Sequence, residues 1–263
     1  LHPMDTWRLL SDPALPGTAN MARDWALLES VAAGDAPPAV RFYAWAPPCL
    51  SLGRHQRPEA ADADFCRAEG VDLVRRPTGG RAVLHDLELT YSVVASLGHG
   101  PVPRALQEAY RTLCAGLVRG ARTLGVDAEL TGGEVNLHLP GPRTAIPCFE
   151  GPAGGEIVVA GRKLIGSAMR SHAGAILQHG AILVGWDGRL QAGAMGLPDD
   201  SLLRPLVTTF TDQLGSPPDR QQLEQALAAG LAEELHVRLD PGTMTPAEEE
   251  RARACTGEFT VAR

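Results

Sequence analysis

The chain has 263 residues, of which 44% are hydrophobic, enough to bury a full core. Charged residues make up an ordinary 21%, which excludes the disordered class, and a formal net charge of −7 disfavours binding to a nucleic-acid backbone. No apolar stretch approaches the ~18 residues that a membrane span needs, and no secretory signal is visible. We therefore expect a cytoplasmic, globular protein without a membrane or nucleic-acid partner.

The first half of the chain alternates between helical and strand patterns. Apolar residues at helical spacing predict a helix over residues 21–32, ending at Gly34. Strands are expected over residues 40–45, 50–53 and 71–76, with a helix opened by Pro58 and closed by Gly70. A tight turn over residues 77–80 leads into strands over residues 81–85 and 89–97.

The second half begins with the longest amphipathic pattern, a helix over residues 104–124. Strand patterns then return as far as residue 186, with a hairpin at Ala160-Gly161 that would place Lys163 opposite Val158. Later residues are mainly helical, and Thr245 and Glu248 form a capping box for the last helix.

This order of elements favours an α+β fold with a mixed or antiparallel sheet and flanking helices, because regular βαβ alternation is missing. Pro217-Pro218 is the best candidate for an internal boundary. We expect a catalytic domain over residues 1–216, with its motifs in residues 19–186, and a small helical C-terminal portion over residues 217–263.

The basic residues are unevenly divided. Lysine and arginine total 24, and a single one of them, Lys163, is lysine, which leaves 23 arginines. A biased codon pool explains the arginines but not the position of the lysine.

Two glycine-bearing segments could bind a ligand. The first runs from Arg75 to Asp86 and contains a glycine pair flanked by arginines, which suits a phosphate or carboxylate. The second, Gly161 to Ala168, carries small residues where a ligand could lie against a strand. An ordinary Gly-Gly turn and a β-bulge are the structural alternatives.

The five cysteines are dispersed and never form a C-x-x-C pair, which argues against disulfides and for a reducing compartment. Cys66 and Cys114 lie in helical patterns and are expected in the core. Cys148 stands in a loop-like setting ahead of a basic segment, where a neighbouring cation would favour the reactive thiolate. A buried, inert thiol is the alternative. The histidines and cysteines show no metal-binding pattern.

Together, these segments resemble the lipoate–protein ligase A / octanoyltransferase family, which shares its catalytic fold with biotin–protein ligases. The resemblance rests on motifs in order and at family spacing, namely Asn20-Met21-Ala22, Arg41 to Trp45, Ser51 to Gln56, Arg75 to Asp86, Leu89 to Ser92, Gly161 to Ala168 and Gln178-His179-Gly180. Cys148-Phe149 ahead of Lys163, and Arg81 after the glycine pair, are most similar to the octanoyltransferases that load the glycine-cleavage H protein.

The resemblance implies that octanoyl passes from acyl carrier protein to Cys148 as a thioester, and then to a lysine of a lipoyl domain. Lys163 would stabilise the Cys148 thiolate, and no cofactor would be needed. The residues that it implies for substrate binding are Arg75, Arg76, Thr78, Gly79, Gly80, Arg81, His85, Thr90, Gly166, Ser167, Ala168, His179 and Gly180.

Three alternatives remain open. A lipoate or octanoate ligase would use ATP and Mg²⁺ and would contact the acyl-adenylate with Lys163. A non-catalytic module would bind an acyl chain or a lipoyl domain, a possibility raised by Gly155 and Met169, where the family usually carries an aromatic residue and glutamine. Transfer between lipoyl-bearing proteins is the third.

Overall fold

The computed structural model describes residues 5–133 and 155–261. Its centre is an eight-stranded mixed sheet in the order β11-β1-β2-β6-β10-β9-β8-β7, beside a three-stranded sheet in the order β4-β3-β5. The strands of the large sheet are β1 (Thr6–Leu15), β2 (Ala39–Trp45), β6 (Glu88–Ser96), β7 (Glu129–Leu130), β8 (Ile157–Val159), β9 (Arg162–His172), β10 (Ala175–Leu183) and β11 (Arg238–Pro241). Those of the small sheet are β3 (Cys49–Leu52), β4 (Asp72–Arg75) and β5 (Val83–His85).

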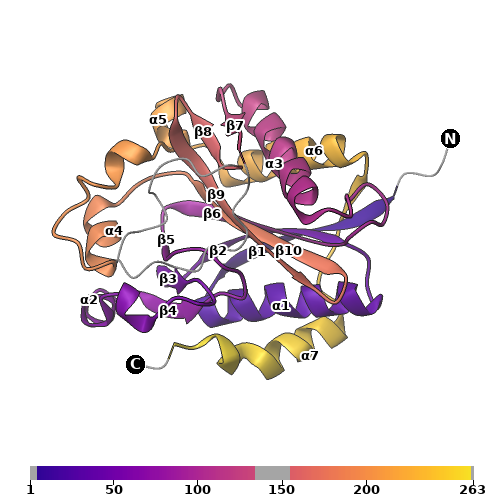
Figure 1. Cartoon of the computed structure of the whole chain (residues 1–263), viewed down its shortest axis with the longest axis horizontal. Coiled ribbons are helices and arrows are strands. Elements are labelled where there is room, and N and C mark those ends of the chain that lie inside the picture. Colours follow the sequence, from indigo (N-terminus) through magenta and orange to yellow (C-terminus); the bar gives the residue numbers. More distant parts are fainter. Residues whose placement is uncertain (1–4, 134–154, 262–263) are drawn as a thin grey trace.

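Helices cover both faces of the large sheet (Figure 1). Helices α1 (Gly17–Ala33) and α7 (Pro246–Cys255) lie on one face, and α3 (Leu106–Thr123) and α6 (Arg220–Leu235) lie on the other. The short helices α2 (Ala63–Ala68) and α4 (Gly188–Ala194) pack beside the small sheet, and α5 (Phe210–Leu214) follows. Parallel pairing of β1 with β2 and β11, and antiparallel pairing of the other strands of the large sheet, confirm the mixed α+β fold.

Most local predictions are confirmed. Helix α1 ends at Gly34, whose φ of 77° is the left-handed conformation that glycine adopts easily. Ala160 and Gly161 have φ values of 49° and 74° and form the expected hairpin turn, and Lys163 pairs with Val158. The capping box of α7 is also present.

One helix was predicted wrongly. Pro58 does not open a continuous helix, because residues 58–60 form a single 3-10 turn. Helix α2 starts only after Asp62, whose carboxylate accepts a hydrogen bond from the Phe65 backbone N–H. The N-cap therefore sets the start of the helix, in place of the proline.

The C-terminal residues pack against the large sheet and share its hydrophobic core. Strand β11 pairs in parallel with β1 at the edge of the large sheet. The apolar face of α6 joins the core beneath α3, through Leu223, Leu227, Leu231 and Leu235. The boundary near residue 217 stays a prediction, and the portion after it contributes a strand as well as helices.

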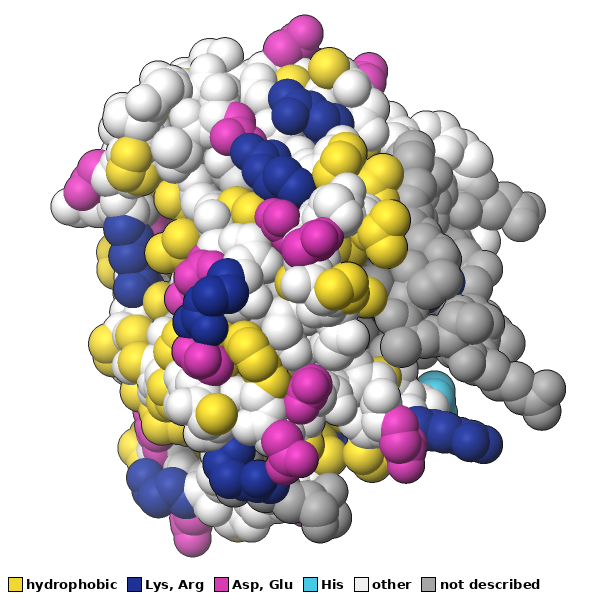
Figure 2. Space-filling model, turned by 90° about the vertical axis from the view of Figure 1, so that its left-hand side faces the viewer, with side chains coloured by type: hydrophobic (Ala, Val, Ile, Leu, Met, Phe, Trp, Pro, Cys, Tyr) yellow, Lys and Arg dark blue, Asp and Glu magenta, His cyan; other side chains and the backbone are white. Residues whose placement is uncertain are grey.

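In residues 5–133 and 155–261, no helix is long and apolar enough to cross a bilayer. Figure 2 shows the side of the molecule that lies at the left of Figure 1, where acidic and basic side chains are interspersed with apolar ones. Charges of both signs thus share this face.

Candidate active site

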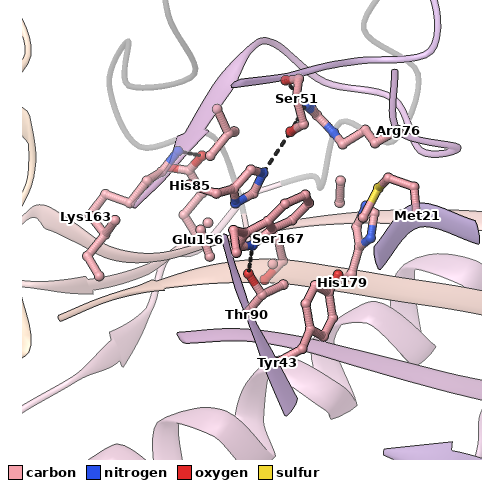
Figure 3. A pocket seen from close by; sticks show the side chains of 17 residues that line it. Met21, Tyr43, Ser51, Arg76, His85, Thr90, Glu156, Lys163, Ser167 and His179 are labelled. Carbon is pink, nitrogen blue, oxygen red and sulfur yellow. Dashed lines mark hydrogen bonds and ion pairs between the residues drawn. The ribbon is translucent and has the colours of Figure 1, made fainter. Parts of the chain in front are cut away.

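A pocket opens between the large sheet and the small sheet (Figure 3). It encloses about 640 Å³ of space, including the part open to solvent, which is in the range of small-molecule sites. Its wall combines apolar and glycine positions with a few convergent polar groups. The lining residues are Met21, Tyr43, Trp45, Ser51, Arg76, Val83, His85, Thr90, Glu156, Lys163, Gly166, Ser167, Ala168, His179, Gly180, Ala181 and Leu183.

Lys163 and Glu156 form an ion pair on this wall. Lys163 is 5% exposed, and its backbone is held on β9 by Val158 on one side and by a hydrogen bond to Thr208 on the other. Its side chain passes over Gly166, where an added Cβ would lie 3.6 Å from Cδ and 3.9 Å from Nζ. Burial raises the pKa of Glu156, and the Lys163 ammonium partly offsets that effect.

Arginine side chains hold the glycine loop over residues 77–80. Arg76 donates to the carbonyl oxygens of Gly79 and Arg81 at 2.8 and 2.6 Å, and to that of Ser51 at 2.9 Å. The loop approaches Gly53 so closely that a Cβ there would stand 1.9 Å from the Gly80 carbonyl oxygen. Position 53 must therefore be glycine for this loop to take its place.

Arg75 fixes the neighbouring segment. Its guanidinium donates to the carbonyl oxygens of Gly53, Arg54 and Gln56, at 3.0, 3.3 and 2.6 Å. Arg75 and Arg76, two of the three arginines of the predicted anion site, thus hold backbone carbonyls in this structure. Their expected contact with substrate stays a prediction.

A buried polar chain runs from the glycine loop into the large sheet. His179 Nε2 lies 2.6 Å from Thr78 Oγ1, and His179 Nδ1 lies 3.1 Å from a carboxylate oxygen of Asp24. Asp24 accepts further hydrogen bonds from Arg41 at 2.7 Å and Tyr43 at 2.8 Å. Burial alone would raise the pKa of Asp24, but the Arg41 charge and the hydrogen bonds from His179 and Tyr43 lower it.

A second histidine is held in the same manner. His85 Nε2 lies 2.7 Å from Ser51 Oγ, and His85 Nδ1 lies 2.8 Å from Glu88 Oε1. The Trp45 ring stacks on the His85 ring at a centroid distance of 4.1 Å, and its indole N–H donates to Thr90 Oγ1 at 2.7 Å. Both pocket histidines are therefore fixed through both ring nitrogens. Figure 3 shows one of these contacts, between His85 and Ser51.

The structure brings most of the predicted site residues together. Those that line the pocket are Arg76, His85, Thr90, Lys163, Gly166, Ser167, Ala168, His179 and Gly180. Thr78, Gly79 and Gly80 belong to the loop that Arg76 holds. Arg81 follows this loop, and its carbonyl oxygen accepts a hydrogen bond from Arg76. Arg75 donates instead to the carbonyl oxygen of Gly53, in the neighbouring segment. Cys148 lies outside the described residues.

Sequence reasoning missed several residues of the pocket and of the buried polar chain. Glu156 begins the first strand of the predicted hairpin, and only the strand register shows that its carboxylate meets Lys163. Asp24 and Arg41 stand in otherwise apolar patterns, over residues 21–32 and 40–45, and a charge inside such a pattern was the available signal. Met21, Tyr43, Trp45, Ser51 and Val83 lie within the motifs that carry the family resemblance but were not predicted as site residues. Ala181 and Leu183 follow the last of these motifs.

The four described cysteines are all buried, as expected for Cys66 and Cys114. Burial raises the pKa of Cys66 to about 11 and that of Cys114 to about 12, and it also raises those of Cys49 and Cys255. None of these four thiols lines the pocket. Within the described part of the chain, no cluster of histidine, cysteine and acidic side chains could hold a metal ion.

Comparison with known proteins places the chain in a class. Residues 16–232 match the family described as lipoyl protein ligase A/B catalytic domain, so the chain belongs to that family. The expected family is therefore confirmed.

Particular relatives cover almost the whole chain. Octanoyltransferase LipM of Kyrpidia tusciae is 41% identical, over 97% of this chain and 97% of its own length. The protein of the same name from Geobacillus kaustophilus is 39% identical, over 95% of each. A solved lipoate-protein ligase A bound with ATP has a TM-score of 0.77 at 29% identity, covering 97% of this chain and 95% of its own.

Proposed function

We propose that this chain is an octanoyltransferase of lipoate biosynthesis, which attaches octanoyl to a lysine of a lipoyl-domain protein. The observation that carries the proposal is the near-full-length match to curated octanoyltransferases, at up to 41% identity. The pocket is compatible with it, because apolar side chains and bare backbone offer a surface for an alkyl chain next to a buried ammonium.

In the first half of the reaction, the Cys148 thiolate attacks the carbonyl carbon of octanoyl-acyl carrier protein. The new carbon–sulfur bond gives an octanoyl-enzyme thioester, and the carrier leaves as a thiolate that takes up a proton. Lys163 is the proposed cation that favours the Cys148 thiolate and supplies this proton. The buried, weakly acidic Cys49, Cys66, Cys114 and Cys255 are poor candidates for the nucleophile.

In the second half, the amine of the acceptor lysine attacks the same carbonyl carbon. An amide forms and the Cys148 thiolate leaves, which restores the enzyme. A lipoyl-domain protein such as the glycine-cleavage H protein is the proposed acceptor. The solved structure of a bipartite lipoate protein ligase of Thermoplasma acidophilum with its E2 lipoyl domain, at 27% identity and a TM-score of 0.77, supports a partner of this kind.

A second candidate is an ATP-dependent lipoate or octanoate ligase, favoured by the TM-score of 0.77 to the ATP-bound ligase. One assay separates the two functions. The enzyme is mixed with a lipoyl domain and either octanoyl-acyl carrier protein alone or free octanoate with ATP and Mg²⁺, using wild type and Cys148→Ala. The transferase forms the amide only from the carrier thioester, and Cys148→Ala abolishes it.

The other results have definite meanings. Amide from octanoate and ATP that survives Cys148→Ala would establish the ligase. Tight lipoyl-domain binding with no amide under either condition would establish a non-catalytic module.

A further inference from the structure

We propose that Glu156 is a further catalytic residue of this pocket, and that it takes a proton from the ammonium of the acceptor lysine. The inference rests on the proposed octanoyl transfer. It assigns the deprotonation of the incoming nucleophile, a step separate from the formation of the acyl-enzyme.

The position of Glu156 is fixed by its neighbours. Its backbone N–H donates to Thr131 Oγ1 at 2.9 Å, and its carbonyl accepts from the Thr131 N–H at 2.9 Å. The following residue opens β8, which pairs with β9 and brings the carboxylate to Lys163. The side chain retains 15% exposure and lines the pocket, so it is anchored beside the space that an acceptor lysine would enter (Figure 3).

One oxygen of the Glu156 carboxylate has no hydrogen-bond partner among the described residues. Oε1 pairs with the Lys163 ammonium, whereas Oε2 is buried and has no hydrogen-bond partner among the described residues. A buried carboxylate oxygen without a donor is unfavourable, and most such atoms in folded proteins have a partner. A nitrogen that enters the pocket with protons to donate, such as a lysine ammonium, would supply that donor.

The other titratable groups of the described pocket are already engaged. His85 uses one ring nitrogen toward Ser51 and the other toward Glu88. His179 likewise uses its two nitrogens toward Thr78 and Asp24. Of Glu156, His85 and His179, only Glu156 has an acceptor atom without a hydrogen-bond partner among the described residues.

The chemistry requires such a group. A lysine with an ordinary pKa near ~10.4 is an ammonium at neutral pH and has no lone pair for attack. Two protons must leave its nitrogen before the amide is complete. One would restore the proton that Lys163 gave to the departing carrier thiolate, and the other would pass to Glu156 and then to solvent. Burial raises the pKa of Glu156, which makes its carboxylate a better base.

Glu156→Gln tests this assignment because it preserves shape and removes the basic oxygen. The two half-reactions are followed separately, formation of octanoyl-enzyme by intact mass and transfer to a lipoyl domain after removal of free carrier. We expect the octanoyl-enzyme to form, and its transfer at pH 7 to slow by about 100-fold or more. The deficit should shrink as the pH approaches the pKa of the acceptor lysine, because more of the lysine is then already neutral.

Three controls sharpen the test. Glu129→Gln removes an exposed carboxylate on the neighbouring strand β7 and should transfer at the wild-type rate. Glu156→Asp keeps a carboxylate and should restore transfer in part, which guards against a loss caused by misfolding. Hydroxylamine, a nucleophile that is neutral at pH 7, should cleave the octanoyl-enzyme of wild type and Glu156→Gln at equal rates.

Several results would overturn the proposal. These are wild-type transfer by Glu156→Gln, an equal loss in both half-reactions, or a transfer deficit that does not change with pH. An equal loss in both half-reactions, or a deficit independent of pH, would mean that Glu156 only positions Lys163. Failure of the wild-type enzyme to form any octanoyl adduct would instead reject the proposed function itself.

Discussion

Lys163 occupies a site that fits an ammonium on an unbranched stem. It is 5% exposed, lies against Gly166 and pairs with Glu156. Arginine carries the same charge on a broad, planar group with a different set of donors, so it is a poor replacement in this enclosed space. We expect Lys163→Arg to lower octanoyl transfer by about 100-fold or more while the melting temperature changes little.

The reciprocal substitution on the adjacent residue is a matched control. Arg162 is half-buried at the start of β9 and does not line the pocket. Arg162→Lys should therefore transfer octanoyl at close to the wild-type rate. Near-wild-type turnover by Lys163→Arg would show that the chain's one lysine is a compositional accident.

His179 predicts a pH dependence of stability. Burial lowers its pKa below the ordinary 6.5, and the hydrogen bond to Asp24 offsets this only in part. The unfolded chain thus binds a proton near pH 6.5 that the folded chain does not. The free energy of unfolding should consequently fall as the pH drops below about 6.5, by up to about 1.4 kcal/mol per pH unit for this group.

Urea unfolding at pH 7.5, 6.5 and 5.5 measures this effect. His179→Gln should show a shallower loss of stability toward pH 5.5 than wild type, because one neutral buried imidazole has been removed. His99→Gln, at an exposed position, should keep the wild-type slope. Equal slopes for all three proteins would contradict the prediction.

At the scale of the elements, the centre of the large sheet depends on a close approach at Gly180. It lies on β10 between Ser167 of β9 and Tyr91 of β6. A Cβ at this position would stand 2.4 Å from the Gly166 carbonyl oxygen and 2.8 Å from Tyr91 Cε1. We expect Gly180→Ala to lower the free energy of unfolding by about 2 kcal/mol, because strands on both sides must shift.

Gly166→Ala is the comparison for that measurement. It lies on the neighbouring strand, but its added Cβ would make only ordinary contacts with the Lys163 side chain, the nearest at 3.6 Å. The free energy of unfolding of Gly166→Ala, measured with urea, should lie within about 0.5 kcal/mol of that of the wild type. If both alanine variants lost the same stability, close packing at Gly180 would not be the cause.

The sequence was informative at most positions where a pattern was local. The apolar stripes of α1 and α3, the Ala160-Gly161 turn and the capping box of α7 depend on residues a few positions apart, and all were predicted. Strand β11 was not predicted, because four residues are too few to define a strand pattern and its partner β1 begins at Thr6. Its pairing is visible only in three dimensions.

The same distinction explains which site residues were found. The glycine loop and the small-residue strand around Gly166 have unusual composition, so the sequence indicated them. Arg41 and Asp24 are ordinary residue types whose importance comes from complete burial against each other. Glu156 acquires its partner only through the β8–β9 register. Burial and long-range pairing are tertiary properties, and short sequence patterns do not encode them.

At the scale of the whole molecule, the two ends of the chain stabilise each other. Arg8 of β1 forms an ion pair of 2.7 Å with Glu248 of α7, whose side chain is fully buried. Hydrogen bonds from Arg8 and from the Thr245 backbone N–H lower the pKa of Glu248 despite its burial, which by itself acts in the opposite direction. Phe259, close to the end of the described chain, joins the core beneath α1.

This arrangement predicts the behaviour of a chain shortened to residues 1–216. Truncation removes α6, whose leucines complete the core against α3, and leaves the outer edge of β1 without β11. Because these contacts belong to the main core, we expect the shortened chain to lose its cooperative thermal transition and its octanoyl transfer together. Circular dichroism and hydrogen exchange would measure the first loss. A sharp transition with protected amides in β6 and β10 would instead show that residues 1–216 are a domain that folds alone.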